Sequence, residues 1–253
     1  MTLATGYHHP GPVEAPRPVQ LSEHVFLVAG EHLSHPFDAS AYLIAGPKPA
    51  LIDCGSAFGW PATRANAIAA GVDPADVQVV LASHCHFDHV SAFAQLALES
   101  DALLLMHESD APGAATGDQD LTAAFLYGTE APPVAVAGTL PDEYHSGPVH
   151  VKVIHTPGHT PGSSCFVVED GPMRLLLTAD TLFGGYHPRI GSDIDAWSES
   201  LGLLAEADFD YLSVGHAHPP LIPHGHQVLA EARLQLGVYF HPWFRPFHMD
   251  FST

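Results

Sequence analysis

Positively charged side chains are scarce in this chain. Its 253 residues include eight lysines and arginines against 28 aspartates and glutamates, which gives a formal net charge of −20. Nucleic-acid-binding proteins draw much of their affinity from basic side chains that contact phosphates. We therefore expect no nucleic-acid partner, and we interpret the acidic surface as a source of solubility.

Long apolar runs and cysteines are also few. No stretch approaches about eighteen apolar residues, so we expect no membrane-spanning helix and no membrane partner. Residues 1–20 are rich in proline and histidine and lack the basic start and apolar core of a signal peptide, so we interpret them as a flexible or wrapping arm of a cytoplasmic protein. The three cysteines, Cys54, Cys85 and Cys165, are too scattered for a disulfide framework.

The most informative segment, residues 83–89, reads Ser-His-Cys-His-Phe-Asp-His and follows the apolar run 77–82. Three imidazoles and a carboxylate in one loop are costly to bury unless something satisfies them. A divalent metal would do so, since these groups are the usual ligands of zinc, with iron and manganese as alternatives. Cys85 alternates with its histidine neighbours and should point away from the metal. The candidate ligands of this loop are His84, His86, Asp88 and His89.

Further candidate ligands follow three later apolar runs. His159 lies in a Thr-Pro-Gly-His-Thr-Pro-Gly segment after a predicted strand, Asp180 ends the run 175–179, and His216 follows the run 211–215. Loops that leave the carboxyl ends of strands in a rigid sheet can converge on one cavity. These side chains therefore complete a candidate two-metal site.

Together with the Leu-Ile-Asp-Cys-Gly turn at 51–55, these motifs resemble those of the metallo-β-lactamase-fold hydrolases, a superfamily that includes glyoxalase II and the acyl-homoserine lactonases. The resemblance covers about residues 22–218. It implies an α+β fold, a four-layer αβ/βα sandwich, with two divalent metal ions, zinc before iron or manganese. It also implies the ligand sets: His84, His86 and His159 for the first metal, Asp88, His89 and His216 for the second, and Asp180 as the bridge.

Other positions refine the resemblance. Asp53 is similar to a carboxylate that orients a ligand histidine through its free N–H; the alternative is that it only caps the turn at Gly55. The antibiotic-destroying members use a cysteine in the second site, whereas His89 with a bridging Asp180 resembles the thioesterase and lactonase branch. Ala179 stands where glycine often precedes the bridging aspartate, and Ser91-Ala92 stands where Gly-Gly often follows the loop.

The order of apolar runs and turn residues favours one domain over residues 21–253, which is long enough for a single two-sheet sandwich. The connection 111–147 is predicted to form a lid or lip over the metals, with Phe125 and Tyr127 as wall residues or as anchors to the core.

The aromatic tail 239–253 either covers the pocket or packs on a second subunit as a homodimer. Strands are predicted at 24–29, 41–45, 50–53, 149–155, 164–168, 174–178 and 211–214, and helices at 61–70, 92–99, 195–206 and 225–238.

The predicted chemistry is hydrolysis of a small-molecule acyl ester, lactone or thioester. A water that bridges two cations loses a proton near neutral pH and becomes the nucleophile, and Asp88 is the candidate catalytic group that relays a proton to the leaving group. With so few cations, we expect a neutral or weakly charged substrate. The candidate substrate contacts, which could equally have plain loop roles, are Phe183, Tyr186, His187 and Arg189.

Two other functions stay open. One is an iron-dependent oxidoreductase such as a persulfide dioxygenase, which resembles this family and uses a subset of the same ligands. The other is a metal-bound sensor without turnover.

Overall fold

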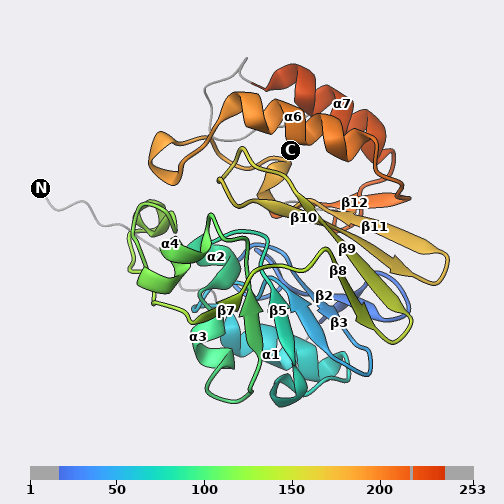
Figure 1. Ribbon diagram of the computed structural model, residues 1–253. Coiled ribbons are helices and arrows are strands. Elements are labelled where there is room, and N and C mark those ends of the chain that lie inside the picture. Colours follow the sequence, from blue (N-terminus) through green and yellow to red (C-terminus); the bar gives the residue numbers. More distant parts are fainter. Residues whose placement is uncertain (1–16, 217–218, 237–253) are drawn as a thin grey trace, which may run out of the picture.

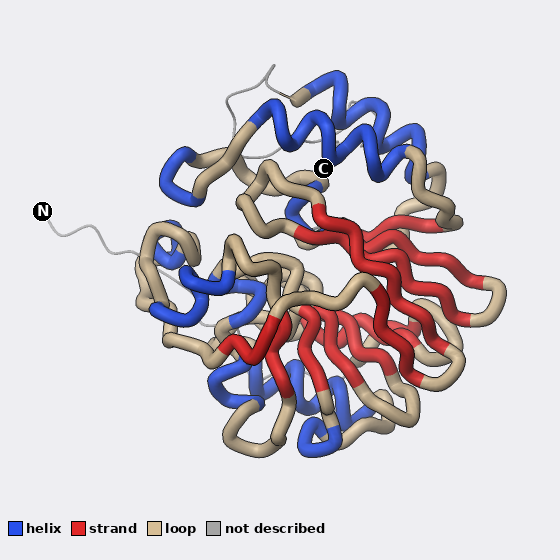
Figure 2. The backbone as a smooth tube through the Cα atoms, in the orientation of Figure 1, coloured by secondary structure: helices blue, strands red, loops and turns tan. Residues whose placement is uncertain are grey.

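The computed structural model describes residues 17–216 and 219–236. Two mixed β-sheets pack face to face, and helices cover the outer face of each sheet (Figure 1). The tube view separates the four layers, with strands in the two central ones (Figure 2). This is the α+β sandwich that the sequence predicts. None of the helices in the described ranges has the length and apolar character needed to cross a bilayer.

The first half of the chain forms the seven-stranded sheet, and the second half forms the five-stranded sheet. The order of the first is β1-β2-β3-β4-β5-β6-β7, and that of the second is β12-β11-β10-β9-β8. The strands are β1 (Val19–Gln20), β2 (Val25–Ala29), β3 (Ala41–Ile44), β4 (Ala50–Ile52), β5 (Val79–Leu81), β6 (Leu103–Leu105), β7 (Val136–Gly138), β8 (Glu143–Ser146), β9 (Val149–His155), β10 (Ser164–Asp170), β11 (Met173–Leu177) and β12 (Tyr211–Ser213).

The longer helices cover the sheets, while several short ones lie among the loops near one end of the sandwich (Figure 1). The helices are α1 (Trp60–Ala69), α2 (Phe87–Val90), α3 (Phe93–Leu96), α4 (Ala111–Thr116), α5 (Ala124–Tyr127), α6 (Ile194–Ala205) and α7 (Gly225–Gln235). Short 3₁₀ turns are η1 (Pro74–Asp76), η2 (Ala179–Thr181) and η3 (Pro188–Ile190).

Successive side chains along each strand point to opposite faces of the sheet, and together they build three apolar layers. On β5, Val80 packs with the helices of the first half, and Leu81 packs with residues of the second sheet. On β10, Phe166 faces the first sheet, whereas Val167 packs beneath α6 and α7. Strands β4, β5 and β6 run parallel. All residues of β4 and β5 are buried, which accounts for their continuous apolar sequences.

Between the two halves, the sequence predicts the helical patch 120–127, where α5 lies, but misses three other elements. Strand β8 reads Glu-Tyr-His-Ser, so no apolar alternation marks it, and it exists because it pairs with β9. Helix α4 and strand β7 also occupy the predicted connection 111–147. At the amino end, Val19 and Gln20 pair with β2, so the end of the predicted arm belongs to the first sheet. The rest of the arm, 1–16, and the tail 239–253 lie outside the described residues.

Candidate metal centre

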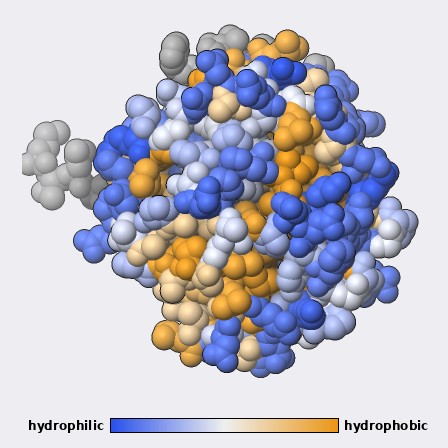
Figure 3. All heavy atoms as spheres, in the orientation of Figure 1, coloured by the Kyte–Doolittle hydropathy of each residue, from blue (hydrophilic) through white to orange (hydrophobic). Residues whose placement is uncertain are grey.

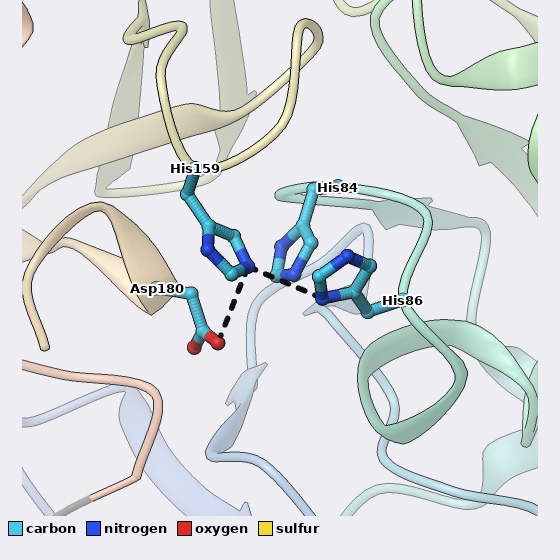
Figure 4. A group of neighbouring side chains, drawn as sticks. All are labelled: His84, His86, His159 and Asp180. Atoms are coloured by element: carbon cyan, nitrogen blue, oxygen red, sulfur yellow. Dashed lines mark hydrogen bonds and ion pairs between the residues drawn. The ribbon is translucent and has the colours of Figure 1, made fainter. Parts of the chain in front are cut away.

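Four buried side chains from three loops point toward one another (Figure 4). His84 and His86 lie between β5 and α2, His159 lies between β9 and β10, and Asp180 lies in η2. Each offers a ligand atom, and these atoms all lie within 4.8 Å of one another. His159 Nε2 is 3.2 Å from His86 Nδ1 and 3.5 Å from Asp180 Oδ2.

A second group of three lies beside the first. Asp88 and His89 belong to α2, and His216 follows β12; their ligand atoms also lie within 4.8 Å of one another. His216 Nε2 is 3.0 Å from Asp88 Oδ2, and His89 Nε2 is 3.8 Å from the same oxygen.

The carboxylate of Asp180 connects the two groups. Its Oδ1 lies 3.2 Å from His89 Nε2 and 3.5 Å from His216 Nε2, while Oδ2 faces His159. One oxygen thus faces each group, the arrangement that a bridging ligand needs. A β-carbon at Gly215 would overlap Asp180 Oδ1, so the backbone can approach the carboxylate only with glycine at that position.

The donor set fits divalent metal ions. Ligand atoms about 2.0–2.1 Å from a tetrahedral zinc lie about 3.3 Å from one another, close to most of the separations above. Within the described residues, the buried atoms His84 Nε2, His89 Nε2 and Asp180 Oδ1 have no hydrogen-bond partner. Burying unsatisfied polar atoms is costly, and coordination to an ion would satisfy all three.

Asp53 orients one histidine of each group. Its Oδ2 accepts hydrogen bonds from His89 Nδ1 at 2.8 Å and from the Ser83 hydroxyl at 2.7 Å. The Ser83 oxygen in turn lies 2.9 Å from Nδ1 of His84, which can donate to it. With both Nδ1 atoms protonated, Nε2 of each ring keeps its lone pair for a metal. The structure therefore confirms the predicted contact between Asp53 and a histidine of the loop.

Asp110 connects the loops that carry the first group, although no motif in the sequence points to it. Its Oδ2 accepts hydrogen bonds from the Cys85 backbone N–H at 3.1 Å and the Thr160 hydroxyl at 2.8 Å. Its Oδ1 accepts one from the Gly162 N–H at 2.7 Å. Cys85 lies between His84 and His86, so this buried carboxylate fixes the separation of the two loops.

The ring of His159 is held from the opposite side. Its Nδ1 donates a hydrogen bond to the Gly185 carbonyl at 2.8 Å, which leaves Nε2 directed at His86 and Asp180. The 183–189 segment is therefore coupled to a candidate ligand.

The two groups differ electrostatically. Burial and neighbouring imidazoles lower the pKa of His84 and of His86 well below the usual value, so both rings are neutral and able to coordinate. Burial alone would lower the pKa of His216, but the carboxylates of Asp180 and Asp88 raise it to about 10. Burial alone would also lower the pKa of His89, but the carboxylates of Asp53, Asp180 and Asp88 raise it well above its usual value.

The predicted substrate contacts lie in different surroundings. Phe183, a candidate substrate contact, is buried in the apolar cluster that contains Trp197. Tyr186 is 39% exposed. His187 accepts a hydrogen bond from the Arg189 N–H and begins η3. Arg189 forms an ion pair with Asp120, and its guanidinium lies over a phenyl ring, so its charge is already paired.

The connection 111–147 lies against the site, as the lid hypothesis requires. Arg189 stacks at 3.9 Å on Phe125, which couples this segment to the 183–189 loop. Burial together with the nearby Asp88 carboxylate raises the pKa of Tyr127 well above its usual value. Cys85 Sγ points away from the ligands toward the Leu121 carbonyl, 3.1 Å away, as the alternation predicts.

Comparison with known families agrees with the fold and the site. Residues 35–216 match the family model described as "Metallo-beta-lactamase superfamily". The chain belongs to this superfamily, whose model match covers every candidate ligand. Among solved structures, the Rm3 metallo-beta-lactamase is similar with a TM-score of 0.72 at 23% identity, covering 88% of this chain and 92% of that one. A Cronobacter sakazakii metallo-beta-lactamase mutant is similar with a TM-score of 0.67 at 26% identity, covering 79% and 80%.

Relatives in sequence carry the names of hydrolases. A probable metallo-hydrolase of Methanocaldococcus jannaschii is 27% identical over 188 residues, which cover 71% of this chain and 88% of the relative. A hydroxyacylglutathione hydrolase of Anaeromyxobacter dehalogenans is 35% identical over 68% of this chain and 58% of its own length. An N-acyl homoserine lactonase of Agrobacterium fabrum is 30% identical over 54% of this chain and 51% of its own length.

Proposed function

We propose that this protein is a dinuclear metal-dependent hydrolase that cleaves an ester, lactone or thioester of a small molecule. The observation that carries the proposal is the position of Asp180, with one carboxylate oxygen facing each group of ligands. His84, His86 and His159 would hold one ion, and Asp88, His89 and His216 the other, with zinc as the first candidate.

Divalent ions bound there would supply a water of lowered pKa and a Lewis acid for a carbonyl oxygen. A side chain of the protein would transfer the proton of the attacking water. Burial alone would raise the pKa of Asp88, but His89 and His216 lower it to about 2, so it is ionised at neutral pH. An ionised carboxylate of low pKa would hold a proton of the attacking water only briefly and would pass it on to the leaving group.

The charges of the described residues favour a neutral or weakly charged acyl substrate. Arg189 is paired with Asp120, Arg174 with Asp210, and Arg64 with Glu99. A multiply anionic ligand such as a glutathione conjugate needs fixed cations to hold it. We infer that the substrate preference is closer to that of the lactonase relative than to that of the hydroxyacylglutathione hydrolase.

The test combines metal analysis with a substrate panel. The purified protein should contain about two divalent ions per chain and should hydrolyse neutral lactones or simple thioesters. Asp180→Ala should lose the second ion and the activity together, while His226→Ala, an exposed residue of α7, should change neither. One tightly bound iron with no hydrolysis would instead favour the oxidoreductase, and bound metal without turnover would favour the sensor.

A further inference from the structure

A separate cluster of metal-binding side chains lies on the outer face of the second sheet. Glu143 and His145 lie on β8, His150 lies on β9, and their ligand atoms are all within 4.8 Å of one another. Neighbouring positions Val149 and Val151 pack into the core between the sheets, so His150 faces the other way. Hydrophilic side chains gather over this part of the surface (Figure 3). None of these residues belongs to the buried centre.

The strand register brings the two imidazoles together. His145 and His150 are direct partners across the antiparallel β8–β9 pair, and their rings stack with centroids 4.4 Å apart and an interplanar angle of 4°. Glu143 is two residues before His145, so it lies on the same face of β8. The backbone pairing thus places both imidazoles and the carboxylate next to one another before any ion binds.

The separations fit coordination better than ion pairing. Glu143 Oε2 lies 3.3 Å from His150 Nε2 and 3.6 Å from His145 Nε2. A charge-assisted hydrogen bond between these groups would be about 2.8 Å long, whereas ligands of one tetrahedral zinc are about 3.3 Å apart. His150 Nε2 is also shielded from solvent and has no hydrogen-bond partner among the described residues.

Glu169 supplies the orienting contact that metal-binding histidines usually have. It is the register partner of His150 on β10, and its Oε2 lies 3.1 Å from His150 Nδ1. With the Nδ1 proton donated to Glu169, the Nε2 lone pair is left facing Glu143. The nearest cation along β9 is Lys152, which is opposite Glu143 in the register and would compete with an ion for that carboxylate.

We propose that Glu143, His145 and His150 form a further divalent-cation site, with Glu169 as a positioning residue. Two imidazoles and a carboxylate suit zinc, copper or nickel better than magnesium or calcium. An ion there would connect β8 to β9, and through Glu169 to β10. Because an ion that binds only the folded protein stabilises it, this site would hold the short strand β8 in register.

The experiment is a zinc titration by calorimetry on protein whose tightly bound ions have been retained. Wild type should take up one more ion per chain than His150→Gln or His145→Gln, and Lys152→Ala should bind it at least as tightly as wild type. His226→Gln is the control for general binding to histidine on an acidic surface and should match wild type. Equal uptake by wild type and His150→Gln, or an equal loss in His226→Gln, would overturn the proposal.

A spectroscopic measurement identifies the ligands. Copper(II) added in place of zinc should give an electron paramagnetic resonance signal with coupling to two imidazole nitrogens in wild type, and to one in His145→Gln. The same signal in both proteins would contradict the assignment. The extra ion should persist in Asp180→Ala, so failure of the buried centre and failure of this site can be told apart.

Discussion

Asp53 Oδ2 lies 2.8 Å from His89 Nδ1, and the same carboxylate reaches His84 through the Ser83 hydroxyl. A single buried side chain therefore sets the tautomer of one histidine in each metal group. Asp53 itself adopts a φ of +55°, a conformation that aspartate tolerates better than most residues. The strained backbone and the shared hydrogen bonds occur at the same residue.

Asp53→Asn should therefore weaken metal binding at both positions. An amide nitrogen in place of Oδ2 would face both the Ser83 hydroxyl and His89 Nδ1, and in place of Oδ1 it would face the Ser83 N–H. Either orientation leaves a donor of the network that orients the histidines without an acceptor. We expect a loss of about 10- to 100-fold in metal affinity, measured by competition with a chromogenic chelator. Asp73→Asn, at an exposed turn before η1, is the matched control. Unchanged affinity in Asp53→Asn would show that the histidines are oriented without this carboxylate.

Asp110→Asn should separate the loops of the first group. An amide nitrogen in place of Oδ1 would face the Gly162 N–H. In place of Oδ2 it would face both the Cys85 N–H and the Thr160 hydroxyl. Either orientation leaves a buried donor without an acceptor. We expect a loss of about 1–3 kcal/mol in unfolding free energy, measured by denaturant titration. Affinity for the ion at His84, His86 and His159 should fall more than affinity for the other ion. An equal loss at both positions would mean that Asp110 acts only on general stability.

Metal uptake at the second group should release protons, whereas uptake at the first should release almost none. In the metal-free protein, the pKa of His216 is raised to about 10 and that of His89 is raised as well. Both rings are therefore in the doubly protonated, positively charged form at pH 8. An ion must displace these protons, about two in number. Its affinity should therefore rise as the pH increases toward 10, and fall at lower pH.

Calorimetry in buffers of different ionisation enthalpy counts the protons released. His216→Ala removes one of the two groups and should reduce the count by about one. Equal release in both binding steps would contradict the difference in charge between the groups.

Ala179→Gly should stabilise the protein. Ala179 has a φ of +43°, in the left-handed region where a β-carbon costs about 1 kcal/mol, and glycine avoids that cost. The added flexibility of glycine in the unfolded chain offsets part of the gain, so we expect an increase of less than about 1 kcal/mol in unfolding free energy. Ala205→Gly, at the end of α6, is the contrasting variant and should destabilise. A lower melting temperature in Ala179→Gly would show that this alanine packs favourably.

The candidate ligands could be predicted because each follows an apolar strand directly, so a short segment contains both the strand and its ligand. Asp110 could not, because the groups it binds are 25 to 52 residues away in the chain. The pairing of Arg189 with Asp120 could not be predicted for the same reason, since 69 residues separate them and only the folded protein brings them together. The burial of Phe183 could not be predicted either, because its position along the chain does not reveal the direction of its side chain.

The candidate ligands are divided between the two sheets, with His84 to His89 following β5 and the others following β9, β11 and β12. Neither half of the chain can complete the centre alone, so the full set of ligands comes together only when the two sheets pack against each other. Ion uptake should therefore occur late in folding and should speed the early steps very little. An ion that is bound in the native state but not in the transition state slows unfolding instead, so the main effect of metal would be on the lifetime of the folded protein.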